Sequence, residues 1–155
     1  MPARESRVEV QFGTRTPWVP AAADLRRWAR AALGETGDPG ELVVRVVDEA
    51  ESAGLNEAYR HKHGPTNVLS FPFEAPPQVD STLLGDVVIC APVVGREARE
   101  QGKASSAHWA HMVVHGVLHL RGYDHVQTEQ AEAMEALERR ILAQLGYRDP
   151  YATGD

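Results

Sequence analysis

Hydrophobic and polar positions along this chain follow two periods, one typical of strands and one of helices. Alternation or runs of β-branched residues predict four strands, over residues 8–12, 42–47, 68–71 and 83–90. Apolar positions three or four apart predict five helices, over about 20–34, 52–60, 92–101, 105–120 and 128–145. Because strands and helices interleave, the sequence predicts one mixed α/β or α+β domain.

Residues that start or stop helices define the expected ends of these elements. Gly34 and Gly122 are expected just after the first and fourth helices, where a left-handed residue ends a helix. Ser52 is expected to cap the second helix, and Ser105 or Ser106 the fourth. We expect residues 1–147 to form a single domain and residues 148–155 to form a loose tail.

Composition and charge are those of an ordinary globular protein. The chain has 155 residues, 43% of them hydrophobic and 25% charged, which suits one domain with a substantial core. It has one cysteine, no signal-like N-terminus and no apolar run long enough to span a membrane, so we expect a cytoplasmic protein. The net charge of −6 argues against non-specific coating of nucleic acid, but it allows a local basic groove.

Three of the seven histidines lie in the segment His115-Gly-Val-Leu-His119-Leu-Arg-Gly-Tyr-Asp-His125. Residues four apart share one helix face, so His115 and His119 can direct two imidazoles at one ion. A turn at Gly122 can bring His125 to the same ion. Such a pair alone is often structural, but the added glycine and third histidine favour a metal site. Three ligands with an open fourth position are typical of catalytic zinc, so we predict one zinc ion per chain at this helix end.

The same spacing occurs in the metzincin motif His-Glu-x-x-His-x-x-Gly-x-x-His, with one difference. Gly116 stands where that motif has the glutamate that takes a proton from zinc-bound water, so peptide hydrolysis is disfavoured. His111, one turn earlier on the same face, is expected in the core or in support of the ligands, and less readily as a fourth ligand. Asp124 is expected either to accept the other ring proton of a ligand or to cap the turn.

Three blocks of this sequence resemble the YbeY family of rRNA maturation endoribonucleases, in the order expected for that family. The histidine segment is similar to the family signature. Residues 55–60 with Lys62, followed by Pro-Thr-Asn-Val-Leu-Ser-Phe-Pro-Phe over residues 65–73, resemble a second block. Leu-Gly-Asp-Val-Val-Ile over residues 84–89 resembles a third. The resemblance covers about residues 41–147.

The resemblance implies a mixed four-stranded sheet and a zinc ion held by His115, His119 and His125. It also implies cleavage of single-stranded RNA, in maturation of the 3′ end of small-subunit rRNA and in ribosome quality control. Ribosomal RNA and ribosomal or ribosome-assembly proteins are the implied partners. Arg60 is linked to activity by the same resemblance, and we expect Arg60 and Lys62 to contact phosphate. The family commonly has aspartate where this chain has His63, which could alter substrate affinity or its pH response.

Three functional hypotheses fit the sequence. The first is a zinc endoribonuclease, with either zinc-bound hydroxide or the 2′-hydroxyl of the RNA as nucleophile. The second is a ribosome-assembly or RNA-binding protein whose zinc is structural, which a fourth ligand such as His111 would favour. The third, a zinc peptidase or amidohydrolase, is disfavoured by Gly116. Taken alone, Arg60 could equally form a surface salt bridge.

Overall fold

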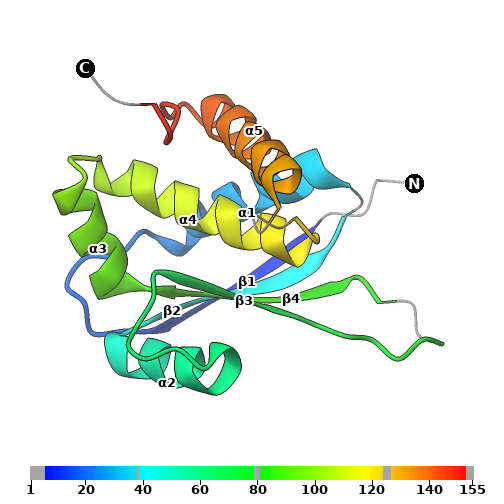
Figure 1. Ribbon diagram of the computed structural model, residues 1–155, viewed down its shortest axis with the longest axis horizontal. Coiled ribbons are helices and arrows are strands. Elements are labelled where there is room, and N and C mark those ends of the chain that lie inside the picture. The colour runs from blue at the N-terminus through cyan, green and yellow to red at the C-terminus, as the bar shows by residue number, and fades with distance from the viewer. Residues whose placement is uncertain (1–5, 38, 79–80, 124–126, 153–155) are drawn as a thin grey trace.

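The predicted domain is confirmed by a computed structural model that describes residues 6–37, 39–78, 81–123 and 127–152 (Figure 1). These residues form a four-stranded mixed sheet and five α-helices. The strands are β1 (Arg7–Gly13), β2 (Glu41–Val47), β3 (Val68–Pro72) and β4 (Leu83–Cys90). The helices are α1 (Ala22–Thr36), α2 (Glu49–Arg60), α3 (Ala91–Glu100), α4 (Ser105–Leu120) and α5 (Thr128–Gln144). None of the described helices combines the length and the apolar character that crossing a membrane requires.

The strand order of the sheet is β1-β2-β4-β3, with β3 antiparallel at one edge and the other pairs parallel. An edge position suits β3, which ends at Pro72, because proline cannot donate a ladder hydrogen bond. Gly85 lets β4 approach β3 closely: its φ is 141°, and a Cβ there would lie 2.1 Å from the carbonyl oxygen of Phe71. The edge strand is therefore held tightly against β4.

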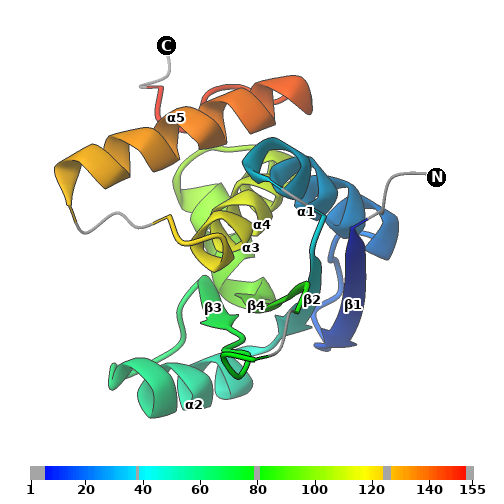
Figure 2. The ribbon, with the colours of Figure 1, turned by 90° about the vertical axis from the view of Figure 1, so that its right-hand side faces the viewer.

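The two faces of the sheet are covered by different helices. Helices α1, α4 and α5 lie on one face and α2 lies on the other (Figures 1 and 2). The side chains of β4 divide accordingly, because Val87 and Ile89 join the main core while Val88 and Cys90 join a smaller cluster. Strand β4 is therefore covered on both faces.

Helix α4 lies between the sheet and α5, in the middle of the main core (Figure 2). Most of its sixteen residues are buried, as expected for a helix that is apolar on most sides. At Gly116 an added Cβ would lie 2.5 Å from Cγ1 of Val87 and 3.2 Å from Cγ2 of Val68. The hydroxyl of Ser70 also donates to the carbonyl oxygen of Gly116, at 2.8 Å. A glutamate at this position would force the helix away from the sheet, because interiors have no room for an unplanned side chain.

Three predictions about helix ends are wrong: Gly34 does not end the first helix, and neither Ser52 nor Ser105 or Ser106 caps a helix. Helix α1 continues through Gly34, because glycine inside a helix costs only about 1 kcal/mol and the buried Leu33 beside it packs in the core. Ser52 does not cap α2, which begins at Glu49; the Ser52 hydroxyl donates instead to the carbonyl oxygen of Thr66, at 3.0 Å. Helix α4 does begin at Ser105, but its N-cap residue is Ala104 and no side chain caps it.

Residues 148–152, expected to belong to a loose tail, contact the domain. The hydroxyl of Tyr151 donates to Oε2 of Glu138 at 2.8 Å, and Nζ of Lys103 donates to the carbonyl oxygen of Pro150 at 3.2 Å. The guanidinium carbon of Arg139 lies 5.2 Å from the centroid of the Tyr151 ring. These contacts hold Tyr151 against Glu138 and Arg139 of α5.

Replacing Gly116 by alanine tests the close contact between α4 and the sheet. We expect Gly116→Ala to lower the free energy of unfolding by about 1–3 kcal/mol, the usual effect of overpacking a core. Gly54→Ala is the matched control, because Gly54 is exposed within α2 and an added Cβ there meets nothing within 4 Å. The control should raise stability by up to about 1 kcal/mol. Urea titrations measure both variants, and an unchanged stability of Gly116→Ala would contradict the contact.

Candidate metal centre

Three histidines of α4 follow one another along one face of the helix. The ring centroids of His111 and His115 are 6.3 Å apart, and those of His115 and His119 are 4.7 Å apart. The Nε2 atoms of His115 and His119 face each other at 3.1 Å. The structure thus brings together two of the three predicted ligands, near the end of the central helix.

The chain turns back directly after these histidines. Helix α4 ends at Leu120, and Gly122 has a φ of 96°, the left-handed conformation predicted for it. The N–H of Gly122 donates to the carbonyl oxygen of His119 and that of Tyr123 to Leu118, both at 3.0 Å. These two bonds form a Schellman motif. The predicted third ligand, His125, and its neighbour Asp124 lie outside the described residues.

A buried carboxylate, Glu138 of α5, contacts the other side of the His115 ring. Its Oε1 accepts a hydrogen bond from Nδ1 of His115 at 3.3 Å, and the residue is only 1% exposed. Its Oε2 accepts hydrogen bonds from the hydroxyl of Tyr151 and from Nε2 of His111. With the proton on Nδ1, His115 presents the lone pair of Nε2 to a cation, which is the usual arrangement of a carboxylate behind a metal-bound histidine.

The donors around Glu138 keep its carboxylate ionised. Burial by itself raises the pKa of this carboxyl group, but the hydrogen bonds and charges of His111 and His115 outweigh burial and lower the pKa to about 2. Burial and the neighbouring Glu138 carboxylate raise the pKa of Tyr151, so the phenol keeps its proton and donates it. At neutral pH the pair is therefore a carboxylate ion and a neutral phenol.

The chemistry of these donors fits a metal ion such as zinc. Two imidazole nitrogens at 2.0–2.1 Å from one tetrahedral zinc lie about 3.3 Å apart, and the two Nε2 atoms here are separated by 3.1 Å. A second group, His111, His115 and Glu138, could also hold a metal ion, because one ligand atom from each lies within 4.8 Å of the others. In that group, however, Glu138 already accepts three hydrogen bonds. The geometry favours Nε2 of His115 as the ligand atom and Glu138 as the group that orients the ring.

His111 faces Glu138 and not the paired Nε2 atoms of the other two rings. The side chain is buried, and its Nε2 hydrogen-bonds to Oε2 of Glu138. Its Nδ1 is buried and has no hydrogen-bond partner within the described parts of the chain. This orientation suits a residue that holds Glu138, and it gives no support to His111 as a fourth metal ligand.

Arg60 ends helix α2, which lies on the opposite face of the sheet from α4 (Figure 2), and Lys62 follows in the next loop. Both side chains are exposed. The edge strand β3 lies between α2 and α4 (Figure 2). Neither side chain forms an ion pair with a carboxylate of the described residues. Among those residues, Arg60 therefore has no partner for the surface salt bridge that the sequence allows. The structure therefore leaves both cations facing solvent beside the loop that leads to β3.

Two buried polar side chains of α2 hold this loop, and the sequence analysis did not identify their role. Ser52 forms hydrogen bonds with both the carbonyl oxygen and the N–H of Thr66, each at 3.0 Å. Nδ2 of Asn56 donates to the carbonyl oxygen of Gly64 at 2.9 Å. Both polar side chains lie on one helix face, four residues apart, which is the signal that could have identified them. They fix the position of the segment that carries Lys62.

Comparison with known proteins identifies the family. A family model described as Endoribonuclease YbeY matches residues 15–146. A curated protein of Alkalilimnicola ehrlichii named Endoribonuclease YbeY is 62% identical over 155 residues, covering 97% of this chain and 92% of the relative. The solution structure of TM1509 from Thermotoga maritima shares the fold, with a TM-score of 0.58 at 23% identity over 94% of this chain and 99% of that one. The chain described here belongs to the YbeY endoribonuclease family.

Proposed function

We propose that this chain is a zinc-dependent endoribonuclease that cuts single-stranded RNA. Its ligands for one zinc ion per chain would be His115, His119 and His125. Family membership supports the ribonuclease activity. The observation that carries the metal assignment is the 3.1 Å separation of the Nε2 atoms of His115 and His119, with Glu138 hydrogen-bonded behind His115.

We extend the proposal to the biological role that the family resemblance implies. The substrate would be single-stranded regions of ribosomal RNA, in maturation of the 3′ end of small-subunit rRNA and in ribosome quality control. Ribosomal or ribosome-assembly proteins would be the partners, in the cytoplasm. The net charge of −6 supports such partners, because a chain this acidic gains little from non-specific attraction to RNA.

Separate residues have separate tasks in this mechanism. Zinc held by the three histidines would supply Lewis acidity, which would make water acidic enough to ionise at about pH 7 and would offset charge on a phosphate oxygen. Glu138 accepts a hydrogen bond from Nδ1–H of His115 and so fixes the orientation of its ring. Asp124 is the candidate for the same task at another ligand. Arg60 offers a planar guanidinium to two phosphate oxygens, and Lys62 adds a less directional charge.

The two alternative functions each meet a specific objection. A peptidase or amidohydrolase of the metzincin type needs a carboxylate at the position of Gly116, where the contact with Val87 leaves no space. A binding protein with a closed structural zinc site needs a fourth ligand. The candidate for that ligand, His111, is hydrogen-bonded to Glu138.

Metal analysis tests the ligand assignment. We expect about one zinc per chain in the purified protein, and loss of both zinc and RNA cleavage in His119→Ala, because two remaining ligands bind the ion weakly. His63→Ala is the matched control, since His63 is exposed on the loop after α2 and should leave the zinc content unchanged. Full zinc retention by His119→Ala would remove the assignment.

The zinc affinity of Glu138→Gln tests the role of the buried carboxylate. Removing its charge should weaken zinc binding by about 10–100-fold, because a neutral amide oxygen is a weaker acceptor than a carboxylate for the Nδ1–H of His115. The exposed Glu132 of the same helix provides the control variant Glu132→Gln. Competition with a chromophoric chelator measures the affinity of the folded protein. A less stable variant with unchanged zinc affinity would mean that Glu138 is only structural.

Substitution of Arg60 tests the substrate contact separately from the metal. We expect Arg60→Ala to keep its fold and zinc but to lose most RNA cleavage, because Arg60 is exposed at the end of α2, on a different helix from His115 and His119. Arg60→Lys should recover only part of the activity, since an ammonium cannot contact two oxygens of one phosphate in the same way. Cleavage by Arg60→Ala at the rate of the unmodified protein would show that Arg60 is a bystander.

A further inference from the structure

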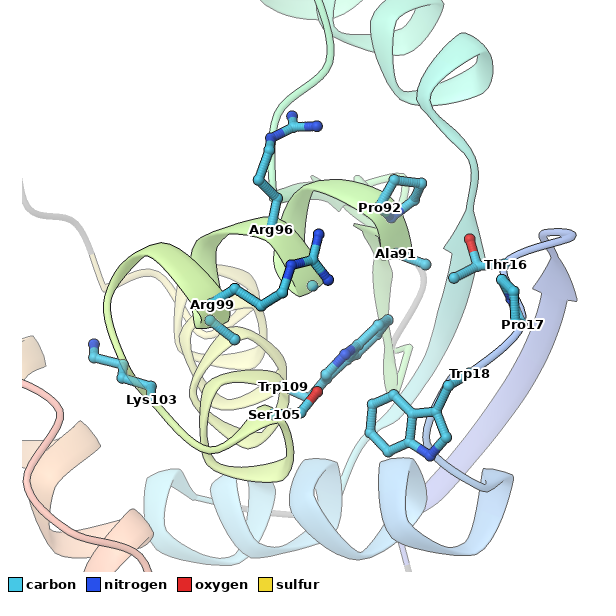
Figure 3. A pocket seen from close by; sticks show the side chains of 12 residues that line it. Thr16, Pro17, Trp18, Ala91, Pro92, Arg96, Arg99, Lys103, Ser105 and Trp109 are labelled. Carbon is cyan, nitrogen blue, oxygen red and sulfur yellow. The ribbon is translucent and has the colours of Figure 1, made fainter.

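A pocket at the other end of α4 is separate from the metal centre. Its volume is about 600 Å³, and α3, the start of α4 and residues 16–18 after β1 line it (Figure 3). Ser105, in the first turn of α4, lines the pocket, whereas His119 lies fourteen residues later, about 21 Å along the helix axis. The size of the pocket is that of an ordinary small-ligand site.

The pocket is positively charged although the chain as a whole is acidic. Arg96, Arg99 and Lys103 line it, and none of its lining residues is acidic. Arg96 points outward (Figure 3) and pairs with Glu49 at 3.7 Å, and Nζ of Lys103 donates to the carbonyl oxygen of Pro150. Arg99 instead extends over the pocket (Figure 3), and no carboxylate of the described residues pairs with it. Arg99 is therefore the charge that the pocket offers to an anion.

An exposed tryptophan lines the same pocket as Arg99. Trp18 is 52% exposed, while Trp28 and Trp109 are 2% and 1% exposed. Figure 3 shows the Trp18 ring next to Trp109, with the Arg99 guanidinium on the other side of Trp109. A single exposed aromatic residue is common and means little alone. An indole near an arginine without a carboxylate partner matches the two parts of a nucleotide, because bases stack on aromatic rings and phosphates bind guanidinium groups.

We propose that this pocket binds a nucleotide of single-stranded RNA, with its base stacked on Trp18 and its phosphate bound by Arg99. The inference rests on the proposed function and deepens it, because the RNA would be held at a second position distant from the zinc ligands. The first turn of α4 at the pocket contains no acidic residue that would repel a phosphate. An acidic peptide would pair with Arg99 but would not require a stacking surface such as Trp18. The presence of both side chains in one pocket therefore favours RNA.

Binding of a single-stranded oligouridine of about twenty nucleotides tests the proposal. Fluorescence anisotropy would be measured in the His119→Ala background, so that the RNA stays intact. We expect Trp18→Ala to weaken binding by about tenfold and Trp18→Phe to restore most of it, since a phenyl ring still stacks. Arg99→Ala should also weaken binding, and it should reduce the slope of log affinity against log salt concentration by about 0.7, the value for one phosphate contact on a single strand.

Arg140→Ala is the matched control for charge. Arg140 is an exposed arginine of α5 that pairs with Glu35 at 3.7 Å, away from the pocket, so its removal should change neither affinity nor salt slope. Affinities of Trp18→Ala and Arg99→Ala within about twofold of the parent would overturn the proposal and leave the pocket to a protein partner. Cleavage and zinc dependence of the unmodified chain are measured in parallel. A chain that cuts no RNA, but whose binding still depends on Trp18 and Arg99, would overturn the proposed function and leave the pocket assignment standing.

Discussion

The candidate metal centre depends on the hydrogen bonds that the ionised, buried carboxylate of Glu138 accepts. The donors are His111 and His115 of α4 and Tyr151 near the end of the chain. A buried charge that loses a partner is strongly destabilising, by about 3–5 kcal/mol when one member of an ion pair is removed. The orientation of the histidines is therefore a property of the packed α4, α5 and C-terminal segment together, and α4 alone does not determine it.

This chain has the histidine spacing of a peptidase motif but lacks the catalytic glutamate of that motif. The packing of α4 on the sheet explains why the glutamate is absent. Gly116 lies directly against β4, and Val87 fills the space that a longer side chain would need. The position is therefore fixed as glycine by packing, whatever the chemistry. Under the proposed function, activation of water depends on the metal, and substrate contact depends on cations such as Arg60 on a different element.

Most of the fold follows from local patterns, whereas the residues that complete the sites come from long-range contacts. The apolar periods correctly predict all five helices and four strands, and Gly122 ends α4 as its sequence suggests. Gly34 and Ser52 show the limit of such rules, because packing of α1 overrides a helix-breaking glycine and a tertiary hydrogen bond occupies the serine. Local sequence does not reveal which distant backbone group a side chain will meet.

Glu138 is the residue that the sequence analysis missed despite an available signal. It follows Met134 by four positions and precedes Ile141 by three, so it falls on the buried stripe of α5. A charged residue on such a stripe implies a buried partner, but its partners lie 23 and 27 residues earlier, in α4. The pocket of Trp18 and Arg99 likewise joins segments far apart in the chain, and no spacing rule connects them.

The position of a bound zinc ion within this cluster distinguishes the two possible sets of ligands. A crystal structure of the zinc-loaded protein, with anomalous diffraction at the zinc edge, would locate the ion among the histidines. We expect a single peak about 2.0–2.1 Å from Nε2 of both His115 and His119, with Nδ1 of His115 still hydrogen-bonded to Glu138. A peak bound to Nδ1 of His115 together with His111 and Glu138 would contradict this expectation.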